Sequence, residues 1–423
     1  MESVSEGVYA ANLAIFSKPQ ADVSILRREW VEVRPTGVLT DGSAVTFDVK
    51  GGEAYIDLKN TRIRTTVKVV GANGEDIPVT AKVGVINHLL HSMWNQVDLR
   101  IQNTTIHPVG PYYPYKSFLD TITTATKEEQ DTQLALSLYT KDYGTDMDDT
   151  DPTSVNNLGL RERFQMTSGS KLVEMVGKLN IDFFNQERLL LNGIPIQVSL
   201  IPSRDRFTLM TKDNKVEFKL KIVSVSLDVC MAHIAPCIAL GQQTALLHAN
   251  ALYPTMQSHL NTFTIDRGHR TGWSDNLFLG KIPDKLYVCM VASAAYEGSF
   301  QRNPFNFQHF NLSYLSFLLN NQSVPAQPLQ PQFDDKLYAS SYDTLFTPQN
   351  KPNITYRNYR EGYAIFALQV ASHFKNKIQP IEQRGNGRLL LKFDKPLPEH
   401  ITVIVYGIFN SVVQIIGDRS VLQ

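Results

Sequence analysis

Two histidines spaced like neighbours on a helix are the first residues in this chain that could support chemistry. His88 and His91 flank Leu89-Leu90, and residues three apart lie on one side of a helix. Two such imidazoles could bind zinc, but a zinc site needs at least one further protein ligand. Because no such ligand is close in sequence, we favour polar groups at the end of a strand or helix.

A cluster of acidic residues is the second candidate. Asp146, Asp148, Asp149 and Asp151 could offer the hard oxygen ligands that calcium prefers. Their spacing lacks the glycine and the terminal glutamate of an EF-hand loop. We favour a solvated acidic loop, and whether the Asp146–Asp151 segment binds an ion stays open.

Sequence motifs of catalysis are missing. The chain has no G-x-S-x-G, H-E-x-x-H, Walker loop or C-x-x-C. Gly385-Asn386-Gly387 begins like a dinucleotide fingerprint, but it lacks the third glycine and opens a strand. The neighbouring acids Asp334-Asp335 and Glu128-Glu129 make poor acid–base pairs, because adjacent residues on a strand face opposite ways. We therefore predict no catalytic, cofactor-binding or metal-binding residues, and no enzyme activity.

Two further strings are better suited to contacts between proteins. Tyrosines and arginines alternate over residues 356–363, where they could stack on bases or sugars. Both residue types are also enriched where proteins meet, and we favour that interpretation. Pro325, Pro328 and Pro331 recur every third residue, which favours an extended polyproline II segment. We favour a stiff loop that crosses its own or a neighbouring subunit over a docking peptide.

Composition narrows the class of protein. The chain has 423 residues, 43% of them hydrophobic, and its 41 Lys and Arg balance 41 Asp and Glu. A neutral chain is a poor candidate for gripping nucleic acid over its whole surface. No apolar run reaches the roughly 18 residues of a membrane helix, and the N-terminus lacks the basic start of a secretory signal. Cys230, Cys237 and Cys289 are interpreted as reduced core residues.

Short strands dominate the rest of the chain. Strands with period-two alternation or short apolar runs are expected at 63–70, 260–266, 285–292, 312–319, 363–370, 387–393 and 401–416. The alternation changes phase near Ile222, which predicts a bulge there. Helix with loops is expected over 116–138, a linker helix over 236–252, and long loops over 139–170 and 322–358. This pattern favours β-sandwiches or barrels over α/β folds.

The same building block occurs twice. Gly177–Phe183 resembles Gly387–Phe393, at an offset of 387 − 177 = 210. Ile101–Ile106 resembles Leu319–Val324 at an offset of 218, and Ile63–Val70 resembles Lys285–Ala292 at 222. Three matches in one order at nearly constant offset predict a tandem duplication of roughly 200 residues, longer than a solenoid repeat. We expect an N-terminal arm over 1–25, a first unit over 26–211 and a second over 212–423.

Several strings carry a likeness to a known family. They resemble a capsid-protein family of Polinton (Maverick) elements and adintovirus-like viruses, over roughly residues 28–415. The strings are Trp30-Val31-Glu32-Val33 through Leu39-Thr40-Asp41-Gly42, Phe184 through Gly193, Asn303-Pro304-Phe305-Asn306-Phe307-Gln308-His309-Phe310, Val324-Pro325, Pro328-Leu329-Gln330-Pro331, Leu397-Pro398 and Val403-Ile404-Val405-Tyr406.

The resemblance implies an all-β fold of two tandem eight-stranded jelly rolls, with short helices in the loops. It implies a major capsid protein that forms homotrimers of hexagonal outline within an icosahedral shell of the virion. The expected partners are neighbouring capsomers and minor or penton proteins, without sequence-specific nucleic-acid binding or a membrane span. The loops 139–170 and 322–358 would project outward or clasp the next subunit. The alternatives are a minor or penton capsid protein, a two-domain carbohydrate-binding β-sandwich that uses Trp273 or the 356–363 string, and a β-sandwich hydrolase.

Overall fold

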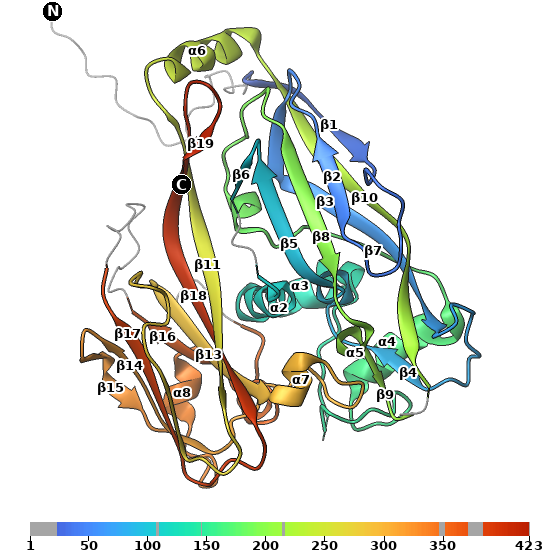
Figure 1. The fold of residues 1–423 in the computed structure, drawn as a ribbon, viewed down its shortest axis with the longest axis vertical. Helices are drawn as coiled ribbons and strands as arrows, with labels where there is room; N and C mark the ends of the chain where they lie inside the picture. Colours follow the sequence, from blue (N-terminus) through green and yellow to red (C-terminus); the bar gives the residue numbers. More distant parts are fainter. Residues whose placement is uncertain are drawn as a thin grey trace, which may run out of the picture.

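The chain folds into two β-sandwiches joined by helices and long loops (Figure 1). The computed structural model describes residues 23–106, 110–144, 146–213, 216–346, 352–370 and 384–422. Most of the predicted N-terminal arm (1–25) lies outside these residues. The all-β architecture that was expected is confirmed.

The first sandwich consists of two four-stranded antiparallel sheets. One has the order β1 (Ile25–Val33), β10 (Phe218–Ile234), β3 (Tyr55–Gly71), β7 (Val173–Gly177). The other has the order β2 (Val45–Val49), β8 (Ile196–Pro202), β5 (Trp94–Ile101), β6 (Thr104–Thr105). When these eight strands are counted along the chain, the sheets read 1-8-3-6 and 2-7-4-5.

The second sandwich repeats this strand order. One sheet has the order β11 (Ala251–Ile265), β18 (Ile401–Ile415), β13 (Lys285–Ala292), β16 (Phe366–Gln369). The other has the order β12 (Thr271–Ser274), β17 (Gly387–Phe393), β14 (Leu312–Leu319), β15 (Gln322–Leu329). Counted along the chain, its sheets again read 1-8-3-6 and 2-7-4-5, so each sandwich is a jelly roll of the same topology. A short strand, β19 (Val421–Leu422), pairs with the C-terminal end of β18.

Shared topology tests the three sequence matches. Ile63–Val70 and Lys285–Ala292 both lie in the third strand of their sandwich, β3 and β13. Ile101–Ile106 and Leu319–Val324 both lie at the turn between the fourth and fifth strands. The third match is wrong: Gly387–Phe393 is the seventh strand, whereas Gly177–Phe183 runs from the end of the sixth strand into the 3-10 helix η4 (Asp182–Asn185). Similar apolar alternation produced that match without structural equivalence.

The predicted boundary at 211/212 is also wrong. Strand β10 lies after it, yet β10 pairs with β1 and β3 in the first sandwich. The division between the sandwiches therefore falls after Ile234. The linker helix begins where it was expected but is shorter, since α6 spans Pro236–Leu246 and β11 already begins at Ala251 to pair with β18. The expected bulge is present, because the register of β10 on β3 shifts between Ile222 and Ser224.

Each sandwich carries a long insertion between its fifth and sixth strands. In the first sandwich, residues 106–172 contain α2 (Tyr113–Thr124), α3 (Lys127–Asp131), η2 (Gln133–Ser137), α4 (Leu158–Thr167) and η3 (Ser168–Ser170). In the second, residues 330–365 contain α8 (Ala339–Asp343) and α9 (Tyr356–Arg360). The expected loop at 139–170 thus contains a helix, which Asn157 caps by accepting a hydrogen bond from the Leu160 amide.

The expected loop at 322–358 also contains a strand. Pro325 and Pro328 lie in β15, at the edge of its sheet, rather than in a polyproline II segment. Proline cannot donate a ladder hydrogen bond, and an edge strand tolerates it because one of its sides has no partner strand. The remaining elements are α1 (Leu89–Ser92), α5 (Asp205–Thr208), α7 (Ser293–Glu297) and the strand pair β4 (Val83–Val85) and β9 (Leu209–Thr211).

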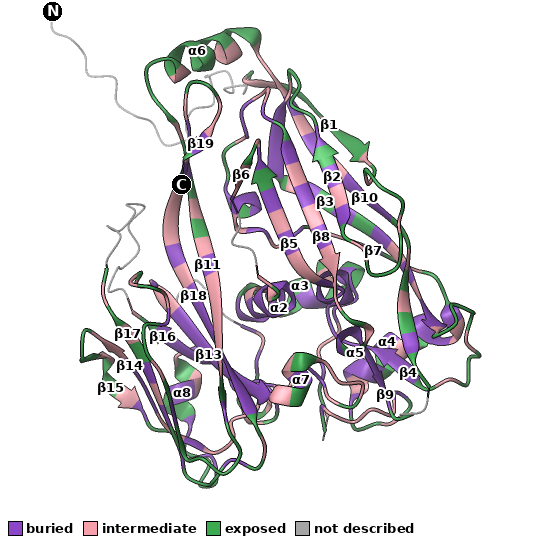
Figure 2. Cartoon of the chain, viewed as in Figure 1, coloured by how far each residue is buried: buried purple, intermediate pink, exposed green. Residues whose placement is uncertain are grey.

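Two apolar cores hold the molecule together (Figure 2). One fills the first sandwich and extends to Tyr253, Val413 and Ile415 on the upper part of the β11–β18 pair. The other fills the second sandwich and extends to α2, with Phe118, among others, in the insertion of the first. The cores therefore cross between the sandwiches in both directions, which makes the joint between them the central structural feature.

Candidate functional site: the joint between the two sandwiches

Helix α2 fills the joint with aromatic rings. Phe118 stacks on Phe305, which lies in the segment between β13 and β14, with ring centroids 4.1 Å apart and an interplanar angle of 6°. Tyr115 stacks on Tyr296 of α7 at 5.3 Å and meets the Phe305 ring edge-on at 5.8 Å. Phe118 and Phe305 are fully buried, so the joint is packed like a protein core rather than a hinge.

A buried ion cluster lies on the other side of the same helix. The Lys116 ammonium is fully buried, 2.7 Å from an Asp120 oxygen and 2.8 Å from an Asp182 oxygen. Both acids also accept from the second sandwich: Asp120 from the Tyr406 hydroxyl at 2.6 Å, and Asp182 from the Ser258 amide and hydroxyl. One cation thus holds two acids that both also accept hydrogen bonds from the other sandwich.

The charges in this cluster depend on each other. Burial alone lowers the pKa of Lys116, but the carboxylates of Asp120 and Asp182 outweigh it and raise that pKa well above its ordinary value. Burial raises the pKa of Asp120 despite the neighbouring ammonium. Lys116 therefore stays charged, and it offsets the charge of two partly buried carboxylates at the joint.

His88 and His91 lie beside this cluster, at the start of α1 and within it. Their rings stack with centroids 4.3 Å apart. His88 Nε2 lies 3.0 Å from the Ser117 hydroxyl, and His91 Nδ1 lies 2.9 Å from the Tyr113 hydroxyl, both on α2. Among the described residues, no group of three or more His, Cys, Asp or Glu is placed to hold a metal ion.

Both imidazoles are held neutral by their surroundings. Burial, and then the charge of Lys116, lowers the pKa of His91 to about 3. Burial, and then His91, lowers the pKa of His88 well below its ordinary value. A proton on either ring would add a second buried positive charge beside Lys116, so the pair is suited to positioning α2 and unsuited to acid–base chemistry near neutral pH.

The acidic loop docks on the second sandwich, which corrects the expectation that it is solvated. Asp148 accepts hydrogen bonds from the Asn303 amide at 2.8 Å, from Asn306 Nδ2 at 3.0 Å and from Arg302 Nη1 at 3.3 Å. Burial raises the pKa of this carboxyl, although these donors lower it. Asp151 instead pairs with Lys82 at 2.8 Å, and this contact leads the lowering of its pKa to about 2.

A second buried ion pair supports the same contact. Arg163 of α4 is fully buried and lies 2.6 Å from Asp142, whose other carboxylate oxygen accepts from Asn303 Nδ2 at 3.0 Å. The Arg163 guanidinium also donates to the carbonyl oxygens of Val85 and Thr140. The loop at 139–170 thus clasps its own chain, whereas the resemblance implied an outward projection or a neighbouring subunit.

The aromatic-basic string divides between interior and surface. Tyr359 and Tyr363 are fully buried, and the Tyr363 hydroxyl donates to the Asp142 carbonyl at 2.8 Å. Tyr356 is partly exposed, and Arg357 pairs with Glu361 on the surface at 3.0 Å. The string therefore forms no continuous stacking platform. Trp273, the other aromatic considered for sugar binding, lies exposed on β12 with no partner from this string.

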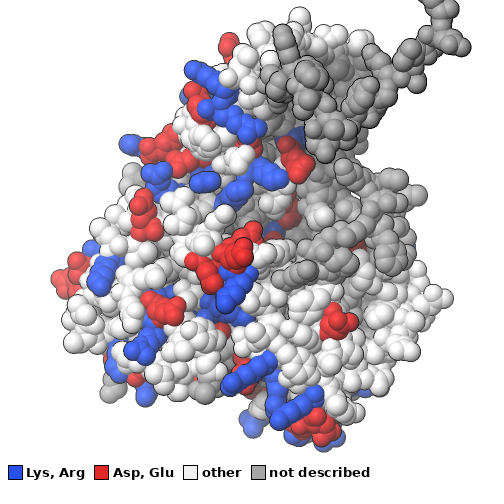
Figure 3. Space-filling view, turned by 180° about the vertical axis from the view of Figure 1, so that it is seen from behind, with Lys and Arg blue, Asp and Glu red and all other residues white. Residues whose placement is uncertain are grey.

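A hollow beneath α6 shows no convergent catalytic groups. Its volume is about 480 Å³, and apolar side chains such as Ile25, Ile234 and Leu246 line it. On the face seen in Figure 3, basic and acidic side chains are interspersed, with no area of one sign. Among the described residues, no helix is both long enough and apolar enough to span a membrane.

Sequence reasoning missed most of this joint. It noted Asn303-Pro304-Phe305-Asn306 for its family likeness, but nothing along the chain links Asn303 to Asp148, 155 positions earlier. The sequence argued against metal binding by the two histidines, but it did not predict their contacts with hydroxyl groups of α2. Lys116 carried a signal that could have been used: a lysine between Tyr115 and Phe118 on an apolar helix must find a buried acid.

Proteins similar to this chain are known, although no known protein-family model matches it. An uncharacterized protein of Caenorhabditis elegans is 24% identical over 380 residues, which cover 85% of this chain and 88% of the relative.

Solved structures match over nearly the whole chain. A chain of the Sputnik virophage covers 100% of this chain and 93% of its own length, with a TM-score of 0.64 at 11% identity. The mavirus major capsid protein covers 100% and 95%, with a TM-score of 0.56 at 11% identity. The Faustovirus major capsid protein covers 97% and 92%, with a TM-score of 0.56 at 7% identity. The fold is a double jelly roll.

The aromatic stack should carry much of the stability of the joint. We expect Phe305→Ala to lower the free energy of unfolding by about 3–5 kcal/mol, because a fully buried ring is replaced by a cavity. Urea unfolding followed by circular dichroism measures this. Trp273→Ala, at a side chain that is 56% exposed, is the control and should change stability far less. Equal losses in both variants would show that the stack is unimportant.

Lys116 should matter more than a surface cation. Lys116→Met leaves two partly buried carboxylates, 27% and 12% exposed, without their cation, so we expect a loss of about 3 kcal/mol of unfolding free energy, the lower end of the range for a fully buried pair. Lys59→Met removes an exposed pair with Glu187 and should cost about 1 kcal/mol or less. Chemical denaturation of both variants at pH 7 gives the comparison. A loss for Lys116→Met no larger than for Lys59→Met would contradict the role assigned to the cluster.

The neutral histidines predict acid sensitivity. Their folded pKa lies below the unfolded value of 6.5, so the unfolded chain binds more protons as the pH falls below 6.5, and stability declines from there towards pH 3. We expect His91→Gln to reduce the slope of unfolding free energy between pH 6.5 and 5, by an amount that approaches about 1.4 kcal/mol per pH unit at the lower pH. Carboxyl groups such as that of Asp120 are present in both the wild type and His91→Gln, so their contribution cancels when the two slopes are compared.

The control for this slope is His248→Gln, because His248 is exposed just after α6. This substitution removes no buried imidazole, so we expect the acid sensitivity of the wild type to remain. Identical slopes for the wild type and His91→Gln would refute the assignment.

Proposed function

We propose that this chain is a structural major capsid protein whose trimers tile an icosahedral shell, and that it acts within a virion. The observation that carries the proposal is the pair of jelly rolls with one strand order, 1-8-3-6 and 2-7-4-5. The mavirus and Faustovirus major capsid proteins support it, because the likeness extends over at least 97% of this chain. The mechanism is assembly, and no catalytic step is proposed.

The chain's geometry suits this role. Two similar sandwiches per chain give six lobes in a trimer, which approximates a hexagon, and closed cyclic symmetry is the usual arrangement of identical subunits. The long strands of both sandwiches slant the same way in Figure 1, as upright lobes of one capsomer would require. The rigid joint fixes the two lobes of each chain relative to one another before assembly.

Within capsid proteins, we propose the Polinton or adintovirus type. The support is the set of strings that includes Asn303-Pro304-Phe305-Asn306, whose side chains dock the acidic loop. Copies of that family are integrated in animal genomes, and a nematode relative that matches 85% of this chain agrees with such a distribution. Minor and penton proteins are the expected neighbours of such capsomers in the shell.

The assembly state tests the proposal. Size-exclusion chromatography with light scattering at micromolar concentration should give a mass of 3 × 47.6 = 142.8 kDa, and negative-stain electron microscopy should show six-lobed particles. A monomer at that concentration would refute the trimer, and five-fold particles would indicate a penton protein instead.

A further inference from the structure

The joint within the chain shows how one sandwich packs on another. The insertion of the first sandwich covers its own strand β7 and then packs, through α2, on the second sandwich. There it meets the sheet β11-β18-β13-β16 on the face where the Tyr406 hydroxyl contacts Asp120. In the shared strand numbering, the insertion after strand 5 of one sandwich lies on the 1-8-3-6 sheet of the next.

The second sandwich has the same insertion, but it has no third sandwich to cover. Phe333 and Tyr359 pack on Phe366 of β16, its sixth strand, just as the first insertion covers β7. Leu337, Phe346 and Tyr356 are exposed, with Leu337 64% accessible. We call these three residues the insertion patch.

Two residues of the insertion patch contact the ring of Tyr342, and the third lies beside one of them. Tyr342 lies 5.2 Å from Tyr356 and 4.9 Å from Phe346, measured between ring centroids. The Tyr356 hydroxyl donates to the Lys336 carbonyl at 3.2 Å, which places Leu337 beside it. Three large apolar side chains in one place are more than the scattered single exposures of an ordinary surface.

The first sandwich has a matching sheet, and within the described residues its outer face is exposed at positions such as Trp30 and Arg64. On β1, Val33 packs towards the core, so alternation back to Arg27 places Arg28, Trp30 and Glu32 on the outer face of the sheet β1-β10-β3-β7. Leu26 lies at the register shift between Ile25 and Arg27. Leu26 is 63% and Trp30 is 57% accessible. We call Leu26 and Trp30 the β1 patch. It lies on the 1-8-3-6 sheet, the equivalent of the sheet that receives α2.

We propose that the insertion patch of one copy docks on the β1 patch of a second copy, and this inference rests on the proposed function. The contact repeats between chains the one that α2 makes within the chain. The insertion patch lies on the corresponding insertion, and the β1 patch lies on the corresponding sheet, at its first strand beside the equivalents of the strands that α2 covers. The partner is therefore another copy of this chain.

The two patches differ, so the contact is head-to-tail. Such a contact closes only if each step turns the next copy by a fixed fraction of a circle. Three copies contribute six sandwiches, with three joints inside chains and three contacts between chains. Every lobe then meets its neighbours in the same way, and neither patch stays exposed.

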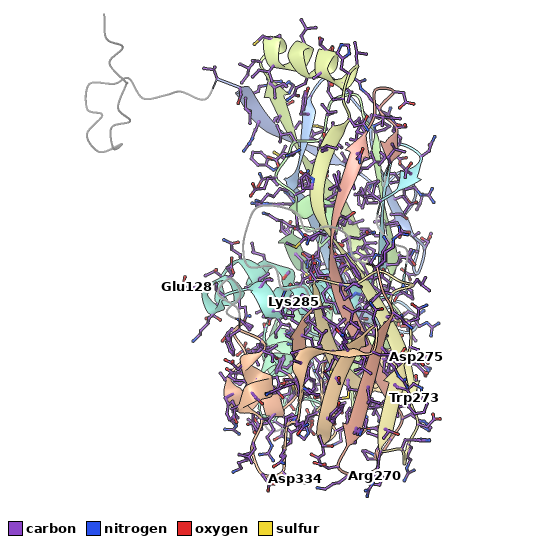
Figure 4. The ribbon with its side chains drawn as sticks, turned by 90° about the vertical axis from the view of Figure 1, so that its left-hand side faces the viewer. Glu128, Arg270, Trp273, Asp275, Lys285 and Asp334 are labelled. Carbon is purple, nitrogen blue, oxygen red and sulfur yellow. The ribbon has the colours of Figure 1, made fainter. Side chains whose placement is uncertain are left out.

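Single substitutions in the full chain test this proposal. Trp30→Glu and Leu337→Glu each place a charge in one patch and should convert the trimer to a monomer in light scattering at micromolar concentration. Trp273→Glu is the matched control, since Trp273 is a tryptophan of equal exposure on the outer edge strand β12 (Figure 4). It should stay trimeric. Circular dichroism checks that all variants are folded, and Leu26→Glu replaces Trp30→Glu should that variant fail to fold.

Mixing the two monomeric variants gives a sharper result. Trp30→Glu keeps its insertion patch and Leu337→Glu keeps its β1 patch, so a 1:1 mixture should form heterodimers of 2 × 47.6 = 95.2 kDa. Each variant alone should remain a monomer. A mixture that stays monomeric would overturn the head-to-tail contact.

The outcomes separate this inference from the function on which it rests. A wild-type chain that is monomeric would overturn both the trimer and the contact. A wild-type trimer that survives Trp30→Glu and Leu337→Glu would overturn the contact alone and leave the capsid function standing. Loss of the trimer only in Trp273→Glu would place the interface on the other sheet and overturn the proposal as well.

Discussion

The structure depends on the burial of one strand on both faces. All of β13 except its first residue is buried, and a sheet with two apolar faces must be covered on both sides. The sheet of β14 and β17 covers one face, and α2, which belongs to the other sandwich, covers the second. The second sandwich is therefore incomplete without the insertion of the first, and the two halves form one stable unit.

Charged residues at the joint give this contact its register. Apolar rings such as Phe118 and Phe305 favour association, but flat rings tolerate sliding. Lys116 held by Asp120 and Asp182, and Asp148 held by Asn303, each satisfy their hydrogen bonds in one relative placement of the sandwiches. A displacement would remove the hydrogen bonds that Tyr406, Ser258 and Asn303 donate to these carboxylates, at about 1.5–3 kcal/mol for each bond to a charged group. The polar clusters thus fix the angle between lobes, which a tiling subunit requires.

Local patterns predicted the strands well and the joint poorly. Strands β13, β14 and β17 were located to the residue, because β-branched and apolar runs between turn residues report burial directly. The bulge at Ile222 was visible as a change of phase. The boundary at 211/212 failed because the eighth strand of a jelly roll returns beside the first, so β10 pairs with strands whose residues lie 218 − 71 = 147 to 234 − 25 = 209 positions earlier. The contact of Asp148 with Asn303 has the same origin, since such pairing is set by topology.

Strand β1 shows how an edge strand can avoid unwanted pairing and still be available for assembly. An exposed edge invites another strand, and natural sheets block this with charged residues along the edge. Arg27 and Glu29 form an ion pair on one face of β1, and His233 of β10 lies 2.9 Å from Glu29. Alternation from Glu29 places the exposed Trp30 on the other face, and the exposed Leu26 lies at the register shift next to Arg27. Pairing along the edge is therefore opposed while contact through the face is favoured, so the strand distinguishes a packed neighbour from an extended sheet.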